Sequence, residues 1–207
     1  HIIDLQKTLR QLELAQKLVR DVVARGEQVL FVCTKRQLAS IVKSEAERAG
    51  AFHITERWLG GLLTNFSTVK KQIKKLKELE AGSEAGGEFE NYTKKEQLMM
   101  TRERDKLSKN LSGIKNMGRL PGLMFVVDSK KEHIAVDEAR KLGIPVVAIV
   151  DTNADPDLIT VPIAGNDDAI RSVELIARTI ADTIAEARQA APQRQQDDEE
   201  SESFTYS

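Results

Sequence analysis

The sequence lacks the residues from which disulfide-bonded and membrane-spanning proteins are built. Cys33 is the only cysteine among 207 residues, so no disulfide can form within the chain. A single thiol, here in an apolar run that predicts a buried strand, is typical of proteins from a reducing compartment. No apolar run reaches the roughly 18 residues that a membrane span needs, and we expect no signal peptide. We therefore predict a cytoplasmic protein without a membrane partner.

The sequence also lacks the short motifs of common catalytic sites. It contains no Gly-x-Gly-x-x-Gly after a strand, no Walker lysine loop and no Gly-x-Ser-x-Gly elbow. The three histidines, His1, His53 and His133, stand far apart without the spacing of metal ligands. We therefore predict no catalytic residue, no metal, no cofactor and no enzyme activity.

Charge is balanced overall but segregated along the chain. The sequence has 31 basic and 32 acidic residues. Between Lys70 and Arg119, thirteen basic residues stand against eight acidic ones, whereas Gln193–Ser207 has five acidic residues and one arginine. An anionic partner would meet the basic region first. The acidic tail has little apolar content, and we predict that residues 192–207 are disordered.

Alternating apolar runs and amphipathic segments indicate an α/β fold. The continuous apolar runs 28–33, 123–128 and 146–151 are typical of parallel strands buried on both faces, and 161–163 predicts a shorter strand. Helices are predicted at 4–24 and on either side of these strands, with capping boxes at Thr34–Gln37 and Ser129–Glu132. The expected architecture is a three-layer, Rossmann/flavodoxin-like, mostly parallel sheet.

A helical hairpin is predicted to interrupt this body. One apolar seam steps by four and three residues through Leu62, Phe66, Val69, Ile73 and Leu76, and a second keeps the same seven-residue phase through Met100, Leu107, Leu111 and Ile114. A glycine-containing stretch, 81–90, separates the two helices. We therefore expect a protruding antiparallel coiled-coil hairpin at 61–118, between body segments 1–60 and 119–191.

Two basic pairs are candidate anion contacts. Lys35–Arg36 and Lys130–Lys131 each follow a predicted strand and lie in the predicted first turn of a helix, where the helix dipole disfavours cations. A bound phosphate would offset that cost. The alternative is that these side chains are simply solvated.

The basic helix and its root are the second group of candidates. Lys70, Lys71, Lys74, Lys75 and Lys77 flank the seam, as expected of a surface that binds the backbone of a nucleic acid. The alternative is a solvated coiled-coil face. Arg57, Trp58 and Asn65 surround the Gly60-Gly61 hinge. Trp58 could stack on a base, but we prefer its interpretation as an anchor of the hairpin root.

Several long motifs, in one order, resemble the universal small-subunit ribosomal protein two family in its bacterial type. They are His1-Ile-Ile-Asp-Leu-Gln-Lys-Thr8, Trp58-Leu-Gly-Gly-Leu-Leu-Thr-Asn65, Asp151-Thr-Asn-Ala-Asp-Pro-Asp157 and Gly165-Asn-Asp-Asp-Ala-Ile-Arg171, with a spaced pattern from Pro121 to Pro145. The resemblance covers almost everything from His1 to Ala191. Family members normally have about forty residues before this start, so an amino-terminal segment is expected to be missing.

The resemblance implies a structural protein of the small ribosomal subunit. Such proteins contact ribosomal RNA and neighbouring ribosomal proteins, and in bacteria they help to dock the large messenger-binding ribosomal protein one; no homo-oligomer is expected. Two hypotheses stand beside it. One is a Rossmann-like enzyme acting on a phosphorylated small molecule, suggested by the basic pairs. The other is a protein-interaction adaptor whose hairpin docks another chain.

Overall fold

The computed structural model describes residues 2–190 and contains one parallel five-stranded sheet. The strands are β1 (Val29–Val32), β2 (Phe52–Ile54), β3 (Leu123–Val127), β4 (Val146–Val150) and β5 (Val161–Ala164). Their order is β2-β1-β3-β4-β5, and every neighbouring pair is parallel. This is the flavodoxin-like order, in which the chain changes direction across the sheet between β1 and β3. The predicted fold class is confirmed.

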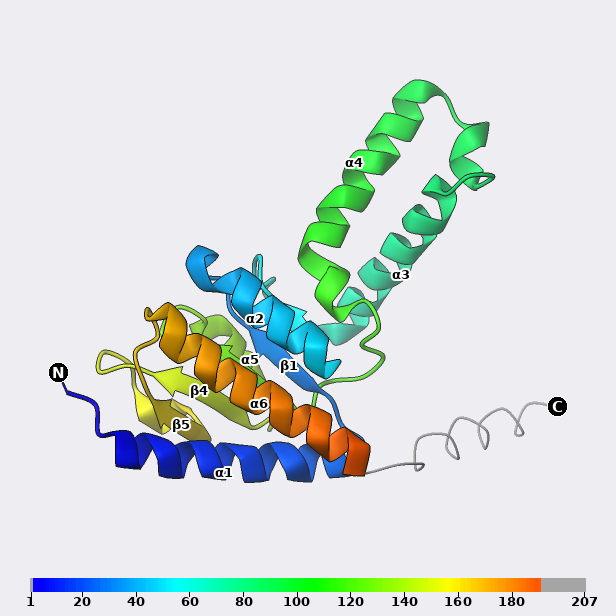
Figure 1. Cartoon of the computed structure of the whole chain (residues 1–207). Coiled ribbons are helices and arrows are strands. Elements are labelled where there is room, and N and C mark those ends of the chain that lie inside the picture. Colours follow the sequence, from blue (N-terminus) through cyan, green and yellow to red (C-terminus); the bar gives the residue numbers. More distant parts are fainter. Residues whose placement is uncertain (1, 191–207) are drawn as a thin grey trace.

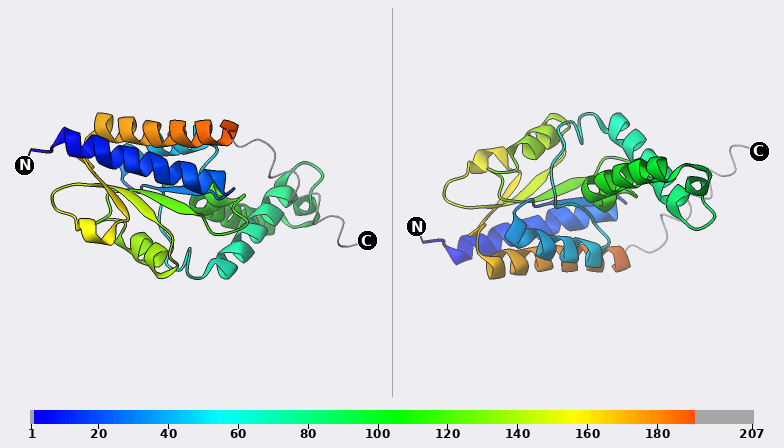
Figure 2. Two further views of the ribbon diagram at one scale, coloured as in Figure 1. Left: turned by 90° about the horizontal axis from the view of Figure 1, so that it is seen from below. Right: turned by 90° about the horizontal axis from the view of Figure 1, so that it is seen from above.

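Helices cover both faces of the sheet (Figures 1 and 2). On one face lie α1 (Leu5–Ala24), α2 (Arg36–Ala49) and α6 (Ile170–Ala190), and α6 packs between the other two. On the other face lie α5 (His133–Lys141) and the short 3-10 turn η3 (Pro156–Leu158). The result is three layers, as predicted from the alternation of strands and helices.

The two sheet faces build two separate cores because strand side chains alternate in direction. Val29 and Phe31 of β1 point towards α1, α2 and α6, and Phe31 meets Phe125 edge to face with ring centroids 5.2 Å apart. Leu30 and Val32 point to the opposite face. This second face is covered only partly by α5, and the root of the hairpin completes it.

The hairpin is inserted between β2 and β3. It consists of α3 (Phe66–Ser83), the turn η1 (Glu88–Asn91), α4 (Lys94–Leu111) and the turn η2 (Ser112–Ile114). Its helices pack on one another and project from the body (Figure 1). At 1.5 Å per residue each helix is about 27 Å long. In the α3 seam Val69, Ile73 and Leu76 are buried and Phe66 is half-buried. The second seam is fully buried only at its base, in Leu111 of α4 and Ile114 of η2.

Some local predictions are wrong. Neither expected capping box forms, because α2 begins at Arg36 and α5 only at His133. Instead the backbone N–H and the hydroxyl of Thr34 both donate to the Glu132 carboxylate. The first residue of one predicted capping box therefore bonds to the last residue of the other. In α1 the amphipathic pattern does not bury every leucine, since Leu5 and Leu9 are exposed.

Other features of composition can now be placed. Cys33 is fully buried at the end of β1, and burial raises the pKa of its thiol to about 11, so the thiol is unreactive. None of the helices in residues 2–190 is both long and apolar enough to cross a membrane. The acidic segment 192–207 lies outside the described residues.

Candidate nucleic-acid interface

A buried carboxylate on α5 fixes the root of the hairpin to the body. Glu138 is 6% exposed and accepts five hydrogen bonds from the turn that leads into α3. Trp58 Nε1 donates at 2.7 Å, and the others come from the backbone N–H groups of Gly61, Leu63 and Thr64 and from the Thr64 hydroxyl, at 3.0–3.2 Å. Together these donors hold the turn in one conformation.

The hydrogen bonds also decide the charge of this carboxyl. Burial by itself would raise the pKa of Glu138, but donation from Trp58 and Thr64 outweighs it and the pKa lies below its usual value. Glu138 is therefore ionised at neutral pH, and each bond that it accepts is charge-assisted. Gly61, in the same turn, has φ of 84°, a left-handed conformation that favours glycine.

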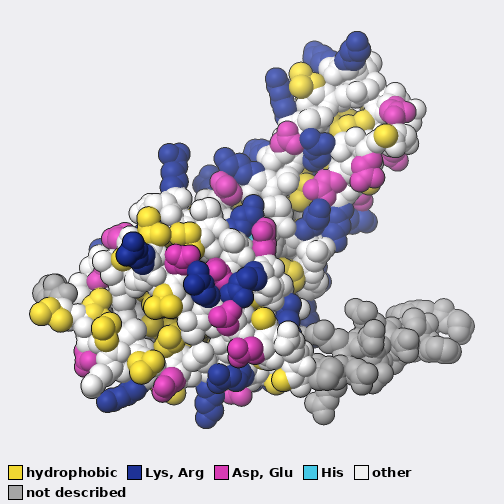
Figure 3. Space-filling model, viewed as in Figure 1, with side chains coloured by type: hydrophobic (Ala, Val, Ile, Leu, Met, Phe, Trp, Pro, Cys, Tyr) yellow, Lys and Arg dark blue, Asp and Glu magenta, His cyan; other side chains and the backbone are white. Residues whose placement is uncertain are grey.

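Lysines from two chain segments line a groove at the hairpin root, which we name the basic groove. Lys70, Lys74 and Lys77 lie on one face of α3, spaced by one helical turn each, and Lys115 comes from the segment after η2. Ile73 and Met117 form the floor of this groove, whose volume is about 310 Å³. Dark-blue side chains gather over this lower part of the hairpin in Figure 3.

The basic groove keeps an excess of positive charge. Lys115 pairs with Glu80 at 2.7 Å, and Lys74 approaches Glu78 only at 4.0 Å, on the exposed surface. Lys70 lies over the Phe66 ring, 5.3 Å from its centroid. Lys77 has no ion-pair partner within residues 2–190. The groove is thus apolar at its floor and cationic at its rim.

The two remaining predicted α3 lysines point elsewhere. Lys75 forms an ion pair with Glu103 of α4 and so ties the two hairpin helices together. Lys71 is exposed and makes no ion pair in the described part of the chain. One face of α3, rather than the whole helix, therefore carries the lysines that converge.

A second hollow of about 280 Å³ adjoins the hinge and contains three of the predicted root residues. Arg57 and Asn65 are exposed at its rim, and the Asn65 Oδ1 accepts a 3.0 Å hydrogen bond from Thr68. Trp58 lies in its wall but is only 9% exposed, and its indole N–H is used by Glu138. This geometry favours the preferred interpretation of Trp58 as an anchor of the root over stacking on a base.

The first basic pair is not arranged to hold an anion. Lys35 Nζ lies 2.8 Å from Asp128, 2.6 Å from Asp168 and 3.3 Å from Asp167. Burial would lower the pKa of Lys35, but these carboxylates raise it above its usual value. Burial and the neighbouring Asp128 in turn raise the pKa of Asp167. The prediction that Lys35 meets a phosphate is wrong, because three carboxylates already occupy its ammonium group.

The other members of the basic pairs are exposed but dispersed. Arg36 begins α2 and is exposed. Lys130 and Lys131 precede α5 rather than lying in its first turn. Lys131 Nζ donates to the Thr34 carbonyl at 3.2 Å. Lys130 borders a largely apolar hollow of about 460 Å³ beside α5. These residues do not converge on one point as the lysines of the basic groove do.

The crevice where ligands bind in this architecture contains an ion pair between two of the chain's own side chains. Such ligands sit outside the carboxyl ends of the strands, where the chain direction switches between β1 and β3. Here Lys35 follows β1 and pairs with Asp128, which follows β3 and holds a left-handed φ of 65°. The fold and its surface define an α/β scaffold with an inserted hairpin and a cationic groove, the type of surface that binds a polyanion.

The chain belongs to the ribosomal protein S2 family, whose model matches residues 1–187. It is 57% identical over 190 residues to small ribosomal subunit protein uS2 of Acidothermus cellulolyticus, covering 92% of this chain and 69% of that protein. It is 53% identical over 202 residues to the uS2 protein of Syntrophobacter fumaroxidans, covering 98% and 73%. The resemblance noted from the sequence motifs is confirmed.

Membership of this family bears directly on the enzyme hypothesis. The family and its relatives are ribosomal proteins, which are structural components and not enzymes. The hypothesis of an enzyme acting on a phosphorylated small molecule finds no support, in agreement with the carboxylates that already pair with Lys35.

Two residues of the interface escaped the sequence-based prediction. Lys115 lies nearly forty positions from the α3 lysines that it joins, and Glu138 resembles any helical glutamate until its five donors are seen. The only signal was that Glu138 belongs to the spaced motif between Pro121 and Pro145.

Proposed function

We propose that this chain is a structural component of the small ribosomal subunit in the cytoplasm and that it binds ribosomal RNA through the basic groove. Family membership supports the first part. The second part depends on one observation, the convergence of Lys70, Lys74, Lys77 and Lys115 around an apolar floor.

The form of the basic groove suits an RNA strand. Ammonium groups on flexible stems contact phosphates without regard to sequence, and such contacts fix the position of a protein on a nucleic acid. The apolar floor, with Met117, offers a surface to a ribose or a base. Arg57 and Asn65 extend the same surface around the root, and Glu138 beneath it keeps the turn rigid.

Charge removal in the basic groove tests the RNA contact. The variant Lys70→Gln/Lys74→Gln/Lys77→Gln is compared with a control of equal net charge, Lys7→Gln/Lys17→Gln/Lys141→Gln, whose lysines are exposed on α1 and α5. The dissociation constant for small-subunit RNA is measured at several salt concentrations. For each phosphate that the protein no longer neutralises, the slope of log K against log salt should fall by about 0.7–0.9.

The two variants should therefore differ in slope and not in stability. All six lysines are exposed, and we expect the unfolding free energies to stay within about 0.5 kcal/mol of the parent. An unchanged salt slope in the groove variant would refute the proposed contact. An equal fall of the slope in both variants would mean that the lysines attract RNA only nonspecifically, through the net charge of the protein.

A second part of the proposal concerns a protein neighbour, the large messenger-binding ribosomal protein one. The family resemblance suggests it, and the body offers an apolar surface: Leu5 and Leu9 of α1 are exposed at 76% and 57%, and Leu175 of α6 at 62%. Yellow side chains gather over these helices in Figure 3.

Binding of that protein should depend on the apolar surface and not on the lysines. We expect Leu5→Ser/Leu9→Ser to weaken its binding to the purified chain and the groove variant to leave it unchanged. If instead the groove variant weakened the binding of that protein and Leu5→Ser/Leu9→Ser did not, the protein contact would lie on the hairpin, as the adaptor hypothesis predicts.

A further inference from the structure

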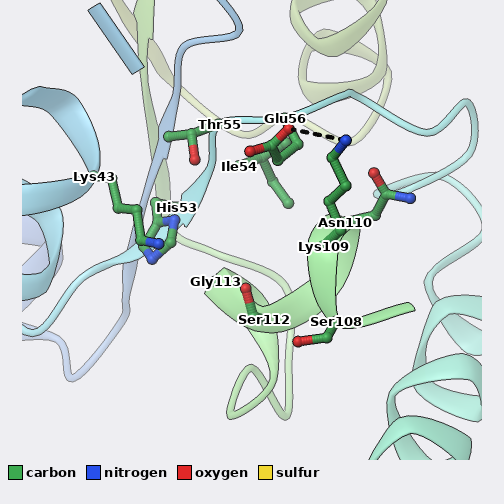
Figure 4. Close-up of a pocket in the computed structure, with 10 residues that line it drawn as sticks. All are labelled: Lys43, His53, Ile54, Thr55, Glu56, Ser108, Lys109, Asn110, Ser112 and Gly113. Carbon is green, nitrogen blue, oxygen red and sulfur yellow. Dashed lines mark ion pairs between the residues drawn. The ribbon is translucent and has the colours of Figure 1, made fainter. Parts of the chain in front are cut away.

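A small polar pocket lies where the hairpin returns to the body, apart from the basic groove. Its volume is about 170 Å³. One wall is formed by Lys43 of α2 and by β2 with the residues after it, and the other by the end of α4 and by η2 (Figure 4). The two walls belong to the body and to the hairpin, so any ligand in this pocket would touch both.

The pocket is rich in hydrogen-bond donors. Thr55, Ser108 and Ser112 supply hydroxyl groups, and Lys43 and Lys109 supply ammonium groups from opposite walls. The single lining carboxylate is Glu56, and Lys109 approaches it at 3.9 Å, a long distance for an ion pair at the surface. This set of groups suits an oxyanion rather than a cation.

The position of Lys43 strengthens this interpretation. Among the described residues Lys43 has no ion-pair partner, and its side chain extends along the body wall beside the His53 ring (Figure 4). His53 is buried at 7% exposure, with Glu47 3.5 Å from its Nε2. Glu47 is thus directed at the His53 ring, and no carboxylate of the described residues forms an ion pair with the Lys43 ammonium group.

We propose that this pocket binds one backbone phosphate of ribosomal RNA, held by Lys43 from the body and by Ser108, Ser112 and Lys109 from the hairpin. The inference deepens the proposed function, on which it rests, by adding a second contact outside the basic groove. Its consequence is geometric: a phosphate held between two walls fixes the angle at which the hairpin leaves the body.

Removal of one charge tests the pocket. We expect Lys43→Gln to reduce the salt slope of binding to small-subunit RNA by about one, the effect of removing a single phosphate-binding lysine. Lys43→Arg keeps the charge and should keep the slope. The matched control Lys17→Gln removes an exposed charge from α1 and should leave the slope unchanged. An unchanged slope in Lys43→Gln overturns the inference.

His53 gives a readout that is independent of affinity. Burial, together with the charge of Lys43, lowers the pKa of His53, while Glu47 opposes this. A phosphate in the pocket adds negative charge, so the His53 pKa measured by NMR should rise when small-subunit RNA is bound. The rise should disappear in Lys43→Gln. An unchanged His53 pKa on RNA binding overturns the inference.

The two sets of variants separate this inference from the proposed function. If the salt slope falls in the groove variant and not in Lys43→Gln, RNA binding through the basic groove stands and the pocket contact fails. If the slope falls in Lys43→Gln alone, the pocket stands and the RNA contact moves away from the groove. If it falls in neither, both fail.

Discussion

Trp58 Nε1 donates a 2.7 Å hydrogen bond to Glu138 Oε2 although 80 positions separate the two residues in sequence. The bond joins the turn before the hairpin to helix α5 on the far side of the insertion. Both partners are buried, and the same carboxylate accepts four further bonds from Gly61, Leu63 and Thr64. One side chain therefore anchors the turn through which the hairpin leaves the body.

Glu138→Gln should destabilise the protein although it preserves the size of the side chain. An amide presents one oxygen and one NH₂ group to a site that contains only donors, so at least one donor is left without its partner and another faces an N–H. We expect a loss of about 2–4 kcal/mol in the free energy of unfolding, measured by urea denaturation.

Glu174→Gln is the matched control, because Glu174 lies at the surface of α6 and, among residues 2–190, forms an ion pair with Arg178 alone. We expect a change of less than about 0.5 kcal/mol there. Equal effects of the two substitutions would contradict the central role of Glu138.

The stability of the parent should fall more steeply with acid than that of Glu138→Gln. The pKa of Glu138 is lowered below its usual 4.5 in the folded protein, so its contribution is complete above that value. The contribution is lost as the pH falls through the folded-state pKa. The raised pKa of Asp167 acts in the opposite direction but is shared by both proteins. Urea denaturation between pH 6 and about 3 should show the two stabilities converging.

Trp58→Ala should cost fold stability first and RNA binding second. The substitution empties a buried site between Glu138 and the hairpin root, and we expect a loss of about 3–5 kcal/mol. At a temperature where the variant is still folded, its lysines remain in place and RNA affinity should fall only modestly. A variant of normal stability that no longer binds RNA would show that the tryptophan touches RNA directly.

The sequence predicts the sheet well because strands buried on both faces leave a simple signal. The runs 29–33, 123–127 and 146–150 are continuously apolar, and each contains a central strand. Local signals failed where a distant partner competed. Thr34 and Ser129 look like helix caps, but the Thr34 hydroxyl and N–H are taken by Glu132, 98 positions away.

Only the part of the candidate site that lies within helix α3 could be predicted from the sequence. The periodicity of α3 identifies its buried seam, and so identifies the lysines as surface residues. It does not show that Lys75 turns to Glu103, that Lys115 joins Lys70, or that Lys35 turns to Asp128. These pairings depend on where segments from far along the chain come to lie.

Lys35→Met should destabilise the body although it replaces a charge with an apolar side chain of similar length. It leaves Asp128 and Asp167 side by side, partly buried and without a cation. We expect a loss of about 3 kcal/mol or more at neutral pH. Protonation of the carboxylates relieves their repulsion, so the loss should shrink below about pH 4.

Arg36→Gln provides the comparison for Lys35→Met. Arg36 is the adjacent basic residue, exposed at the start of α2. We expect an effect below about 0.5 kcal/mol at both pH values. A Lys35→Met variant as stable as the parent would mean that the cluster contributes nothing to the fold.

Gly113→Ala should loosen the hairpin at its return to the body. Gly113 lies against the edge strand β2, where an added Cβ would overlap the His53 carbonyl oxygen and come 2.5 Å from His53 Nδ1. The backbone cannot yield cheaply at this point, because η2 packs along the edge of the sheet. We expect a loss of about 1–3 kcal/mol or more, from crowding a closely packed contact.

Gly60→Ala, at a position with no atom within 4 Å of the added carbon, should change stability by less than about 1 kcal/mol. Hydrogen exchange separates a local from a global effect: amides near His53 and Ile114 should exchange faster in Gly113→Ala, while those of β3 and β4 keep their protection. Uniform loss of protection would mean that the hairpin and the body unfold as one unit.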